Sequence, residues 1–240
     1  MNCPKCNLEQ SDRNLECARC GLIFSKYIPR EHRKAPEAEK RSLASRVVDY
    51  LLFTKDEVST VYFGGRAILF VFLLIWSMKF LHYSIESNYV GRSFMHLVNL
   101  PFHEAGHVVF LWAGSVMHSL GGTLGQIIMP LVCLLVFLIK SRDTFGASVA
   151  LWWTGESILD IAPYINDARS LSLQLLGGNT GATAPYGFHD WNFILTELGL
   201  LRHDHLIADI AGGTGKCLIV LSLIWSLILL TRQYKEIKKG

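Results

Sequence analysis

Long apolar runs dominate the chain from residue 66 onward, with short polar stretches between them. The runs cover residues 66–83, 94–116, 120–139, 145–165 and 206–230. A helix needs about 20 apolar residues to cross the hydrocarbon core of a bilayer. The third run contains no charged side chain, whereas the fourth contains Glu156 and Asp160. The pattern predicts an all-α polytopic membrane protein with about four to six transmembrane helices.

The first part of the chain has a different character. Residues 29–41 are rich in charged side chains and include two prolines, which indicates a solvated linker. Residues 42–53 place apolar side chains at helical spacing, as in a helix along the membrane surface or a plain linker helix. We therefore expect four parts: a module at 1–28, a linker with an interfacial helix at 29–65, a membrane domain at 66–231, and a basic tail at 232–240.

Composition agrees with a membrane protein. Half of the 240 residues are hydrophobic and 18% are charged, compared with about a quarter in soluble domains. The first apolar run begins far from the N-terminus, so we expect no cleavable signal peptide. Lysine and arginine gather near both ends of the chain rather than in a stripe, so no nucleic-acid partner is expected.

Two CxxC pairs form the N-terminal motif. Cys3 and Cys6 make the first pair, and Cys17 and Cys20 make the second after ten intervening residues. Four thiolates from two tight turns complete a tetrahedral structural zinc site, as in a zinc ribbon. A disulfide framework is the alternative, but without a signal peptide the module is expected in the reducing cytosol. Its closed coordination shell fits docking to a protein partner rather than chemistry.

The second apolar run contains His103-Glu104-Ala105-Gly106-His107, which reads HExxH. Histidines four residues apart lie on one face of a helix, so both imidazoles can reach one Zn²⁺. Glu104 would then accept a proton from water as the catalytic base. Ionisable side chains in a membrane helix each cost about 3 kcal/mol unless they are paired or hydrated, and a metal supplies that partner. Pro101 precedes the motif and predicts a kink or a restart of the helix.

A catalytic zinc needs a third protein ligand. Glu156, Asp160 and Asp167 share a helical face in the fourth run, and Asp160 is the first candidate. The alternative for this acid is pairing with Lys216 or Arg169. His189 is the second candidate ligand, and Asp190 beside it would then orient its ring.

Gly121, Gly122 and Gln126 follow the motif and present two alternatives. Irregular backbone here would hold an extended substrate by main-chain hydrogen bonds. Alternatively, the glycines serve close helix packing. A second glycine cluster, at 212–216, looks like a phosphate-binding loop but lacks its first glycine and its final Ser or Thr, so it indicates helix packing or a kink.

HExxH in an apolar segment, the following Gly-Gly and Gly-Gln stretch, and the later Leu159-Asp160 together resemble a site-2-protease-type intramembrane zinc metalloprotease. The resemblance covers about residues 94–167. It implies that His103, His107 and Asp160 bind zinc and that Glu104 is the base. The chain departs from the family pattern at Ile161, where the family has glycine, and no Asn-Pro stretch precedes Asp160.

The expected function is therefore peptide hydrolysis in membrane proteins, with one catalytic and one structural Zn²⁺, the bilayer and a membrane protein substrate as partners, and the zinc ribbon in the cytoplasm. A non-catalytic zinc-binding membrane scaffold or regulator is the main alternative, and a metal transporter is another.

Overall fold

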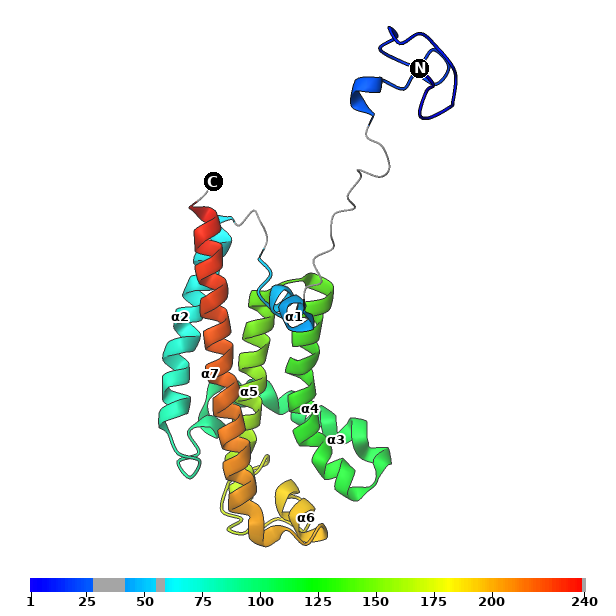
Figure 1. Ribbon diagram of the computed structural model, residues 1–240. Helices are drawn as coiled ribbons and strands as arrows, with labels where there is room; N and C mark the ends of the chain where they lie inside the picture. Colours follow the sequence, from blue (N-terminus) through cyan, green and yellow to red (C-terminus); the bar gives the residue numbers. More distant parts are fainter. Residues whose placement is uncertain (28–41, 55–58, 239–240) are drawn as a thin grey trace. The chain divides into compact units, whose positions relative to one another are not determined.

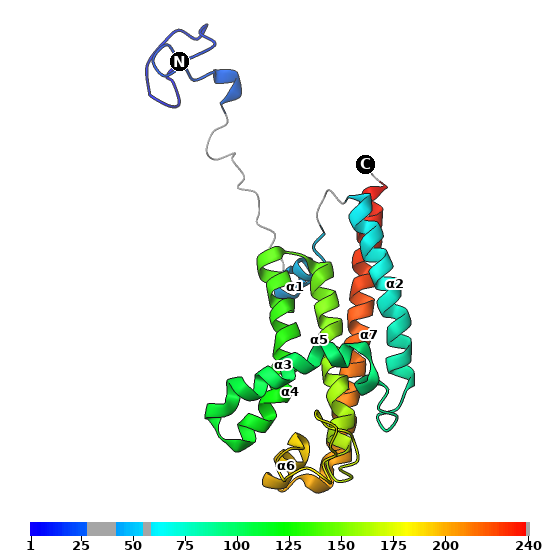
Figure 2. The ribbon, with the colours of Figure 1, turned by 180° about the vertical axis from the view of Figure 1, so that it is seen from behind.

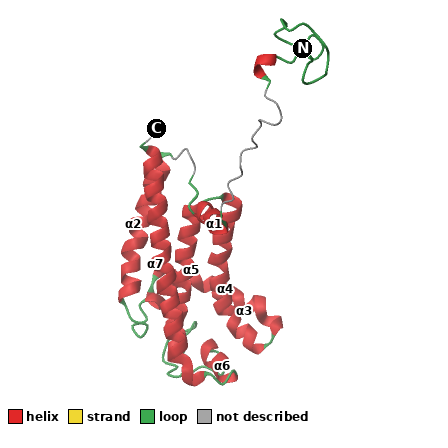
Figure 3. Cartoon of the chain, viewed as in Figure 1, coloured by secondary structure: helices red, strands yellow, loops and turns green. Residues whose placement is uncertain are grey.

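The computed structural model describes residues 1–27, 42–54 and 59–238, and the described residues form helices with no extended strands (Figures 1 and 3). The predicted linker at 29–41 lies outside the described residues. The chain divides into two units, Met1–Arg46 and Val47–Gly240. The described residues contain seven α-helices: α1 Leu43–Leu51, α2 Thr60–His82, α3 Phe94–Phe110, α4 Ser115–Leu135, α5 Thr144–Asn166, α6 Asp190–Glu197 and α7 Asp204–Ile237. Helix α7 continues through most of the predicted tail at 232–240.

Among the described residues, three helical segments of the second unit are long and apolar enough to cross a membrane. They are Thr60–His82, Ser115–Ser141 and Leu201–Ile237, which correspond to α2, to α4 with the helical turn that follows it, and to α7 with the short turn before it. Helix α5 also has 23 residues and runs antiparallel to α7, packed along it (Figures 1 and 2). The described helices therefore support a membrane protein with at least three candidate spans.

Helix α3 corrects the sequence prediction for the second apolar run. It contains 17 residues, so it is about 25 Å long, less than the hydrocarbon core requires. Figure 2 shows that it crosses the bundle instead of running parallel to α4 and α5. Gly114 adopts a φ of 94° between α3 and α4, a conformation that favours glycine and ends the helical path. The 94–116 run is therefore not one continuous helix, and α3 is not among the candidate spans of the described residues.

Two further local predictions for this region need correction. Helix α3 begins at Phe94, and Pro101 lies inside it, so the helix does not restart at the proline. The segment containing Gly121 and Gly122 is regular helix within α4, so the alternative of irregular backbone is wrong. Because the helix is regular at both positions, the HExxH segment has two rigid neighbours: the remainder of α3 and the first half of α4.

Glycines allow the close crossing of α5 and α7 in the second unit. A Cβ on Gly155 of α5 would lie 2.9 Å from the carbonyl oxygen of Gly215 of α7. Gly215 belongs to the 212–216 cluster, so the helix-packing interpretation of that cluster is confirmed. An apolar cluster with Leu73, Phe80, Trp152, Leu159 and Ile219 surrounds this crossing. The α5 and α7 pair is thus the rigid base against which α3 and α4 are positioned.

Candidate metal sites

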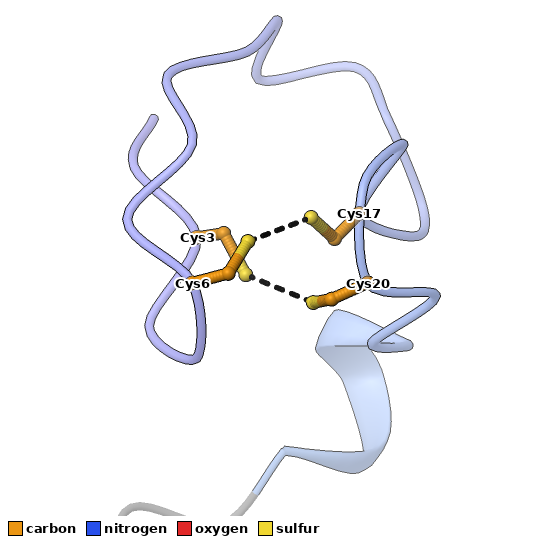
Figure 4. Close-up of side chains that lie close together, drawn as sticks. All are labelled: Cys3, Cys6, Cys17 and Cys20. Carbon is orange, nitrogen blue, oxygen red and sulfur yellow. Dashed lines mark hydrogen bonds between the residues drawn. The ribbon is translucent and has the colours of Figure 1, made fainter.

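The four N-terminal cysteines converge as predicted and could hold a metal ion (Figure 4). The Sγ atoms of Cys3 and Cys20 are 3.7 Å apart, and those of Cys6 and Cys17 are 3.5 Å apart. A disulfide requires about 2.05 Å, so these thiols are free. The structure thus confirms the prediction that these four cysteines come together in a group that could bind a metal ion.

The two halves of this cluster are built alike. The amide of Asn7 donates to the carbonyl of Cys3, and the amide of Gly21 donates to the carbonyl of Cys17, both at 2.9 Å. Asn7 and Gly21 each have positive φ, 57° and 66°, one residue after the second cysteine of their pair. Each CxxC turn therefore ends in a residue type that tolerates the left-handed conformation.

A second group that could hold a metal ion forms in the second unit from His103, His107 and Asp190. Oδ2 of Asp190 lies 3.3 Å from Nε2 of His103 and 3.4 Å from Nε2 of His107. The two imidazole rings of α3 thus face the first residue of α6, far along the chain. HExxH supplies two members of the group as predicted, and a different residue supplies the third.

Hydrogen bonds at the opposite ring nitrogens fix both imidazoles. Nδ1 of His107 donates to the carbonyl oxygen of His118 at 2.8 Å, because a carbonyl only accepts. Nδ1 of His103 lies 2.8 Å from Oε1 of Gln126. The Gln126 amide nitrogen donates to the carbonyl of Ser157, so its oxygen is the acceptor for His103. In its neutral form each imidazole would consequently present an Nε2 lone pair toward Asp190.

This arrangement is unfavourable without a cation. Oδ2 of Asp190 lies within hydrogen-bonding distance of both Nε2 atoms, and all three of these acceptor atoms lie within 4.8 Å of one another. A proton on one ring would satisfy one contact, whereas a metal ion would satisfy all three at once. Orientation of ligand imidazoles by carbonyl or amide oxygens behind them is the usual arrangement in metal sites.

Asp190 is buried and held in place by Tyr164 of α5. Its backbone amide donates to the Tyr164 hydroxyl at 2.9 Å, and that hydroxyl lies 3.4 Å from Oδ2. Burial alone would raise the pKa of Asp190, but its interactions with His103 and His107 outweigh the burial and hold the pKa below its ordinary value. The carboxylate is therefore ionised and suited to bind a cation.

Asp167 organises the loop that delivers Asp190. Its carboxylate accepts hydrogen bonds from the amides of Ser172 and Leu173, both at 2.9 Å, and lies 3.3 Å from Nε2 of His189. Burial raises the pKa of Asp167, but the hydrogen bonds from His189, Ser170 and the two amides outweigh it, so the pKa lies well below its ordinary value. The loop start is thereby fixed to the end of α5.

His189 is a structural residue in this geometry rather than a ligand. Its Nδ1 accepts the backbone amide of Asn192 at 3.1 Å and caps α6. Its Nε2 therefore carries the proton and donates to Asp167. The sequence interpretation reversed the pair: Asp190 joins the metal group, and His189 positions it.

Asp160 also lies outside the metal group, which corrects the first-choice third ligand. Its two carboxylate oxygens are each 3.0 Å from Nδ1 of His96, and Asn99 donates to it at 3.2 Å. The alternative partners, Lys216 and Arg169, are engaged elsewhere: Lys216 donates to carbonyls at the end of α2, and Arg169 pairs with Asp204. Asp160 lines the same cavity as the metal group but is committed to His96.

The glycines after the motif bring α3 and α4 together. A Cβ on Gly106 would lie 2.0 Å from the carbonyl oxygen of Gly121, and one on Gly125 would lie 2.2 Å from that of Phe102. Gly122 faces the site itself, because a Cβ there would lie 2.4 Å and 2.6 Å from Nε2 of His103 and His107. The packing alternative is confirmed for Gly121, and Gly122 makes room for the imidazoles. Gln126 orients His103.

A cavity of about 350 Å³ opens onto the metal group. Glu104, His103, His107, Tyr164 and Asp190 line it, together with Asp160 and apolar residues of the loop. The side chain of Glu104 is exposed, in contrast with the buried Gly106 two positions later. A carboxylate free to meet a ligand therefore stands beside two oriented imidazoles.

Sequence reasoning missed the roles of Asp190, Tyr164 and His118. Asp190 carried one usable signal, since an acidic residue in the first turn is typical of a helix start. Tyr164 and His118 carried none, because their roles arise from contacts between helices.

No protein-family model, curated protein or solved structure matches the chain.

Proposed function

We propose that the chain is a membrane-embedded zinc metalloprotease, in which His103, His107 and Asp190 hold the catalytic Zn²⁺ and Glu104 is the base. The observation that carries the proposal is the convergence of two oriented Nε2 lone pairs on one carboxylate oxygen. Tetrahedral zinc with bonds of about 2.0–2.1 Å separates its ligand atoms by roughly 3.3–3.4 Å. The nitrogen-to-oxygen distances of 3.3 and 3.4 Å fit that spacing.

The N-terminal cysteines support a structural Zn²⁺ by the same comparison. Zinc–sulfur bonds of about 2.3 Å place tetrahedral sulfurs roughly 3.8 Å apart. The observed separations of 3.5 and 3.7 Å come close to that value. Four cysteines leave no open coordination position, whereas two histidines and one aspartate leave one for water or substrate.

The proposed reaction is hydrolysis of a peptide bond. Bound zinc would lower the pKa of water toward 7 and polarise the carbonyl to be attacked. Glu104 lines the cavity and is free to accept the proton of the attacking water and then to donate it to the leaving amine. Gln126 and the His118 carbonyl keep the imidazoles in one tautomer, and Tyr164 keeps Asp190 in place.

Apolar walls favour a membrane protein substrate. Leu100, Ile161, Leu175 and Phe188 line the cavity beside the metal group. A peptide whose side chains are hydrocarbon would bury them there, and the bilayer supplies such peptides at high local concentration. A transmembrane substrate must first unwind, because helical carbonyls are engaged in internal hydrogen bonds.

The distribution of basic residues supports a cytoplasmic location for the N-terminus. The start of α2, the turn between α4 and α5, and the end of α7 lie at the same end of the second unit (Figures 1 and 2). Arg66, Lys140, Arg142 and Arg232 belong to this end, and Arg66 pairs with Asp143 at 3.0 Å. Cytoplasmic ends of membrane helices carry such an excess of Lys and Arg.

With α3 not crossing, α2, α4, α5 and α7 make four crossings and return the C-terminus to the side of the start of α2. The zinc ribbon precedes α2 and is proposed on this side, where it would dock to a protein partner. Helix α6 lies at the opposite end of the unit (Figure 1), so the catalytic site would face away from the cytoplasm.

Cleavage by paired variants tests the proposal. Purified protein in detergent would be incubated with an internally quenched library of apolar, bilayer-length peptides, with zinc content measured in parallel. Glu104→Gln should retain zinc and lose cleavage, because glutamine cannot accept the proton from water. Asp209→Asn, which changes an acid on α7 outside the cavity, is the control and should cleave normally. Equal cleavage by Glu104→Gln and wild type would overturn the mechanism. Zinc binding without cleavage by any form would favour a non-catalytic zinc protein.

A further inference from the structure

The cavity at the metal group extends along helix α3. His96, Leu100, His103 and His107 line it, and their spacing of four, three and four residues places them on one face of the helix. A helix rises about 1.5 Å per residue, so His96 lies about 10 Å from His103 along the axis. Asn88 and Gly91 line the cavity beyond His96. The cavity is therefore an elongated cleft with the metal group toward one end.

His96 is a second polar centre in this cleft. Its Nδ1 lies 3.0 Å from both carboxylate oxygens of Asp160, and a carboxylate only accepts, so Nδ1 carries a proton. The Asp160 side chain is 2% exposed, whereas that of His96 is 39% exposed. The buried acid thus fixes the imidazole and leaves Nε2 as the nitrogen available to a ligand.

A hydrogen-bond network locks this pair from behind. The side-chain amide nitrogen of Asn99 donates to Asp160 at 3.2 Å and to Glu156 at 2.9 Å. The amide oxygen of Asn99 accepts the indole N–H of Trp153 at 2.8 Å. These contacts join α3 to α5, so the His96 ring is held by two helices.

The cleft between the two polar centres has apolar walls. They comprise Leu100, Ile161, Leu173, Leu175, Leu176 and Phe188. A ligand that fills the cleft therefore needs hydrocarbon side chains and a hydrogen-bonding group at the His96 end. An extended peptide advances about 3.3–3.6 Å per residue, so about 10 Å corresponds to three residues.

We propose that His96 is a substrate-binding residue that hydrogen-bonds the main chain of an extended apolar peptide about three residues from the metal group. This inference rests on the proposed function for the metal and the peptide substrate. Binding affinity then depends on peptide length, because shorter peptides contact the metal group alone, whereas longer ones also contact His96.

A series of metal-anchored peptides tests the proposal without relying on cleavage. Hydroxamates of one to five leucines chelate zinc at one end, and their dissociation constants would be measured with zinc-loaded full-length protein in detergent micelles. In the wild type, affinity should rise smoothly with each leucine. An additional step of roughly tenfold should occur when the third or fourth residue reaches His96, the worth of one well-placed hydrogen bond.

Two substitutions at His96 separate ligand contact from structural support. His96→Asn keeps a group near Nδ1 for Asp160 but cannot reach into the cleft, so the affinity step should vanish while the shortest hydroxamate binds normally. His96→Gln places an amide near Nε2 and should restore part of the step. Zinc content measured in each variant controls for damage to the metal group.

The outcomes distinguish the two proposals. An unchanged step in His96→Asn, or no step in wild type that binds the shortest hydroxamate, would overturn the role of His96 and leave the proposed hydrolysis standing. A step that depends on His96, in a protein that cleaves no peptide, would support the binding role and overturn the hydrolysis. Failure of every hydroxamate to bind zinc-loaded protein would overturn the binding role.

Discussion

Gly122→Ala should abolish metal binding by His103, His107 and Asp190 while leaving the fold intact. A Cβ on Gly122 would lie 2.4 Å from Nε2 of His103 and 2.6 Å from Nε2 of His107. Favourable contact begins at about 3.5 Å, so each imidazole would have to retreat by about 1 Å. Ligand distances in metal sites tolerate only about 0.2 Å.

Moving the two imidazoles away from a Cβ at position 122 should change the free energy of unfolding only slightly. The two clashing atoms are the far ends of side chains, which can rotate away without moving either helix. Alanine is favoured over glycine in helices by about 0.5–1 kcal/mol, which offsets part of the about 0.5–1.5 kcal/mol lost for each weakened Nδ1 hydrogen bond, so thermal stability should change little. Metal affinity should fall by at least the roughly 10–100-fold that loss of an outer hydrogen-bond partner costs.

The assay is zinc analysis of purified protein together with thermal unfolding in the presence of a chelator. The described part of the wild-type chain has two groups that could hold a metal, so zinc per chain should fall from two to one in Gly122→Ala. Gly213→Ala is the matched control, since a Cβ at Gly213 of α7 meets nothing within 4 Å. Full zinc content in Gly122→Ala with unchanged affinity would refute the placement of the imidazoles against α4.

Two further substitutions probe the support around the site. Gly155→Ala should destabilise the protein by about 1–3 kcal/mol, because its Cβ would meet backbone atoms of α7 at 2.9 Å that cannot rotate away; thermal unfolding would show this, with Gly65→Ala, which meets nothing within 4 Å, as the neutral control. Asp167→Asn should expose the 168–189 loop to proteolysis and weaken metal binding, since the anchor of His189 is weakened. In wild type the pKa of Asp167 is lowered, so its contribution to stability is present above about pH 4 and is lost as pH falls below that value. Limited digestion with pepsin at pH values on either side of pH 4 would reveal the loss. Equal cleavage of the loop in wild type and in Asp167→Asn at pH 5 would contradict the prediction.

The helical character of the second unit, with segments long and apolar enough to cross a membrane, could be predicted because it depends on composition and length. The same is true of the four cysteines, whose spacing along the chain defines their turns. His103 and His107 were predictable because four residues bring two side chains together on any helix. Each of these features is local in sequence.

The third member of the metal group was not predictable in this way. Asp160 and Asp190 are both acids that follow apolar or glycine-rich segments, and both line the same cavity. Which one meets the histidines depends on the crossing of α3 over the bundle and on the anchoring of the 168–189 loop by Asp167. Neither the helix crossing nor the loop anchoring produces a periodic pattern in the sequence. The interruption of the 94–116 run at Gly114 was missed for a related reason, since hydropathy does not record the direction of a helix.

Zinc stoichiometry in two matched variants tests the central assignment most directly. Asp190→Asn and Asp160→Asn each remove one negative charge from the cavity and preserve side-chain size. With Asp190 as the third ligand, Asp190→Asn should hold one zinc per chain, the ion of the N-terminal cysteines, and Asp160→Asn should hold two, one for each candidate group. Two zinc ions in Asp190→Asn and one in Asp160→Asn would contradict the assignment.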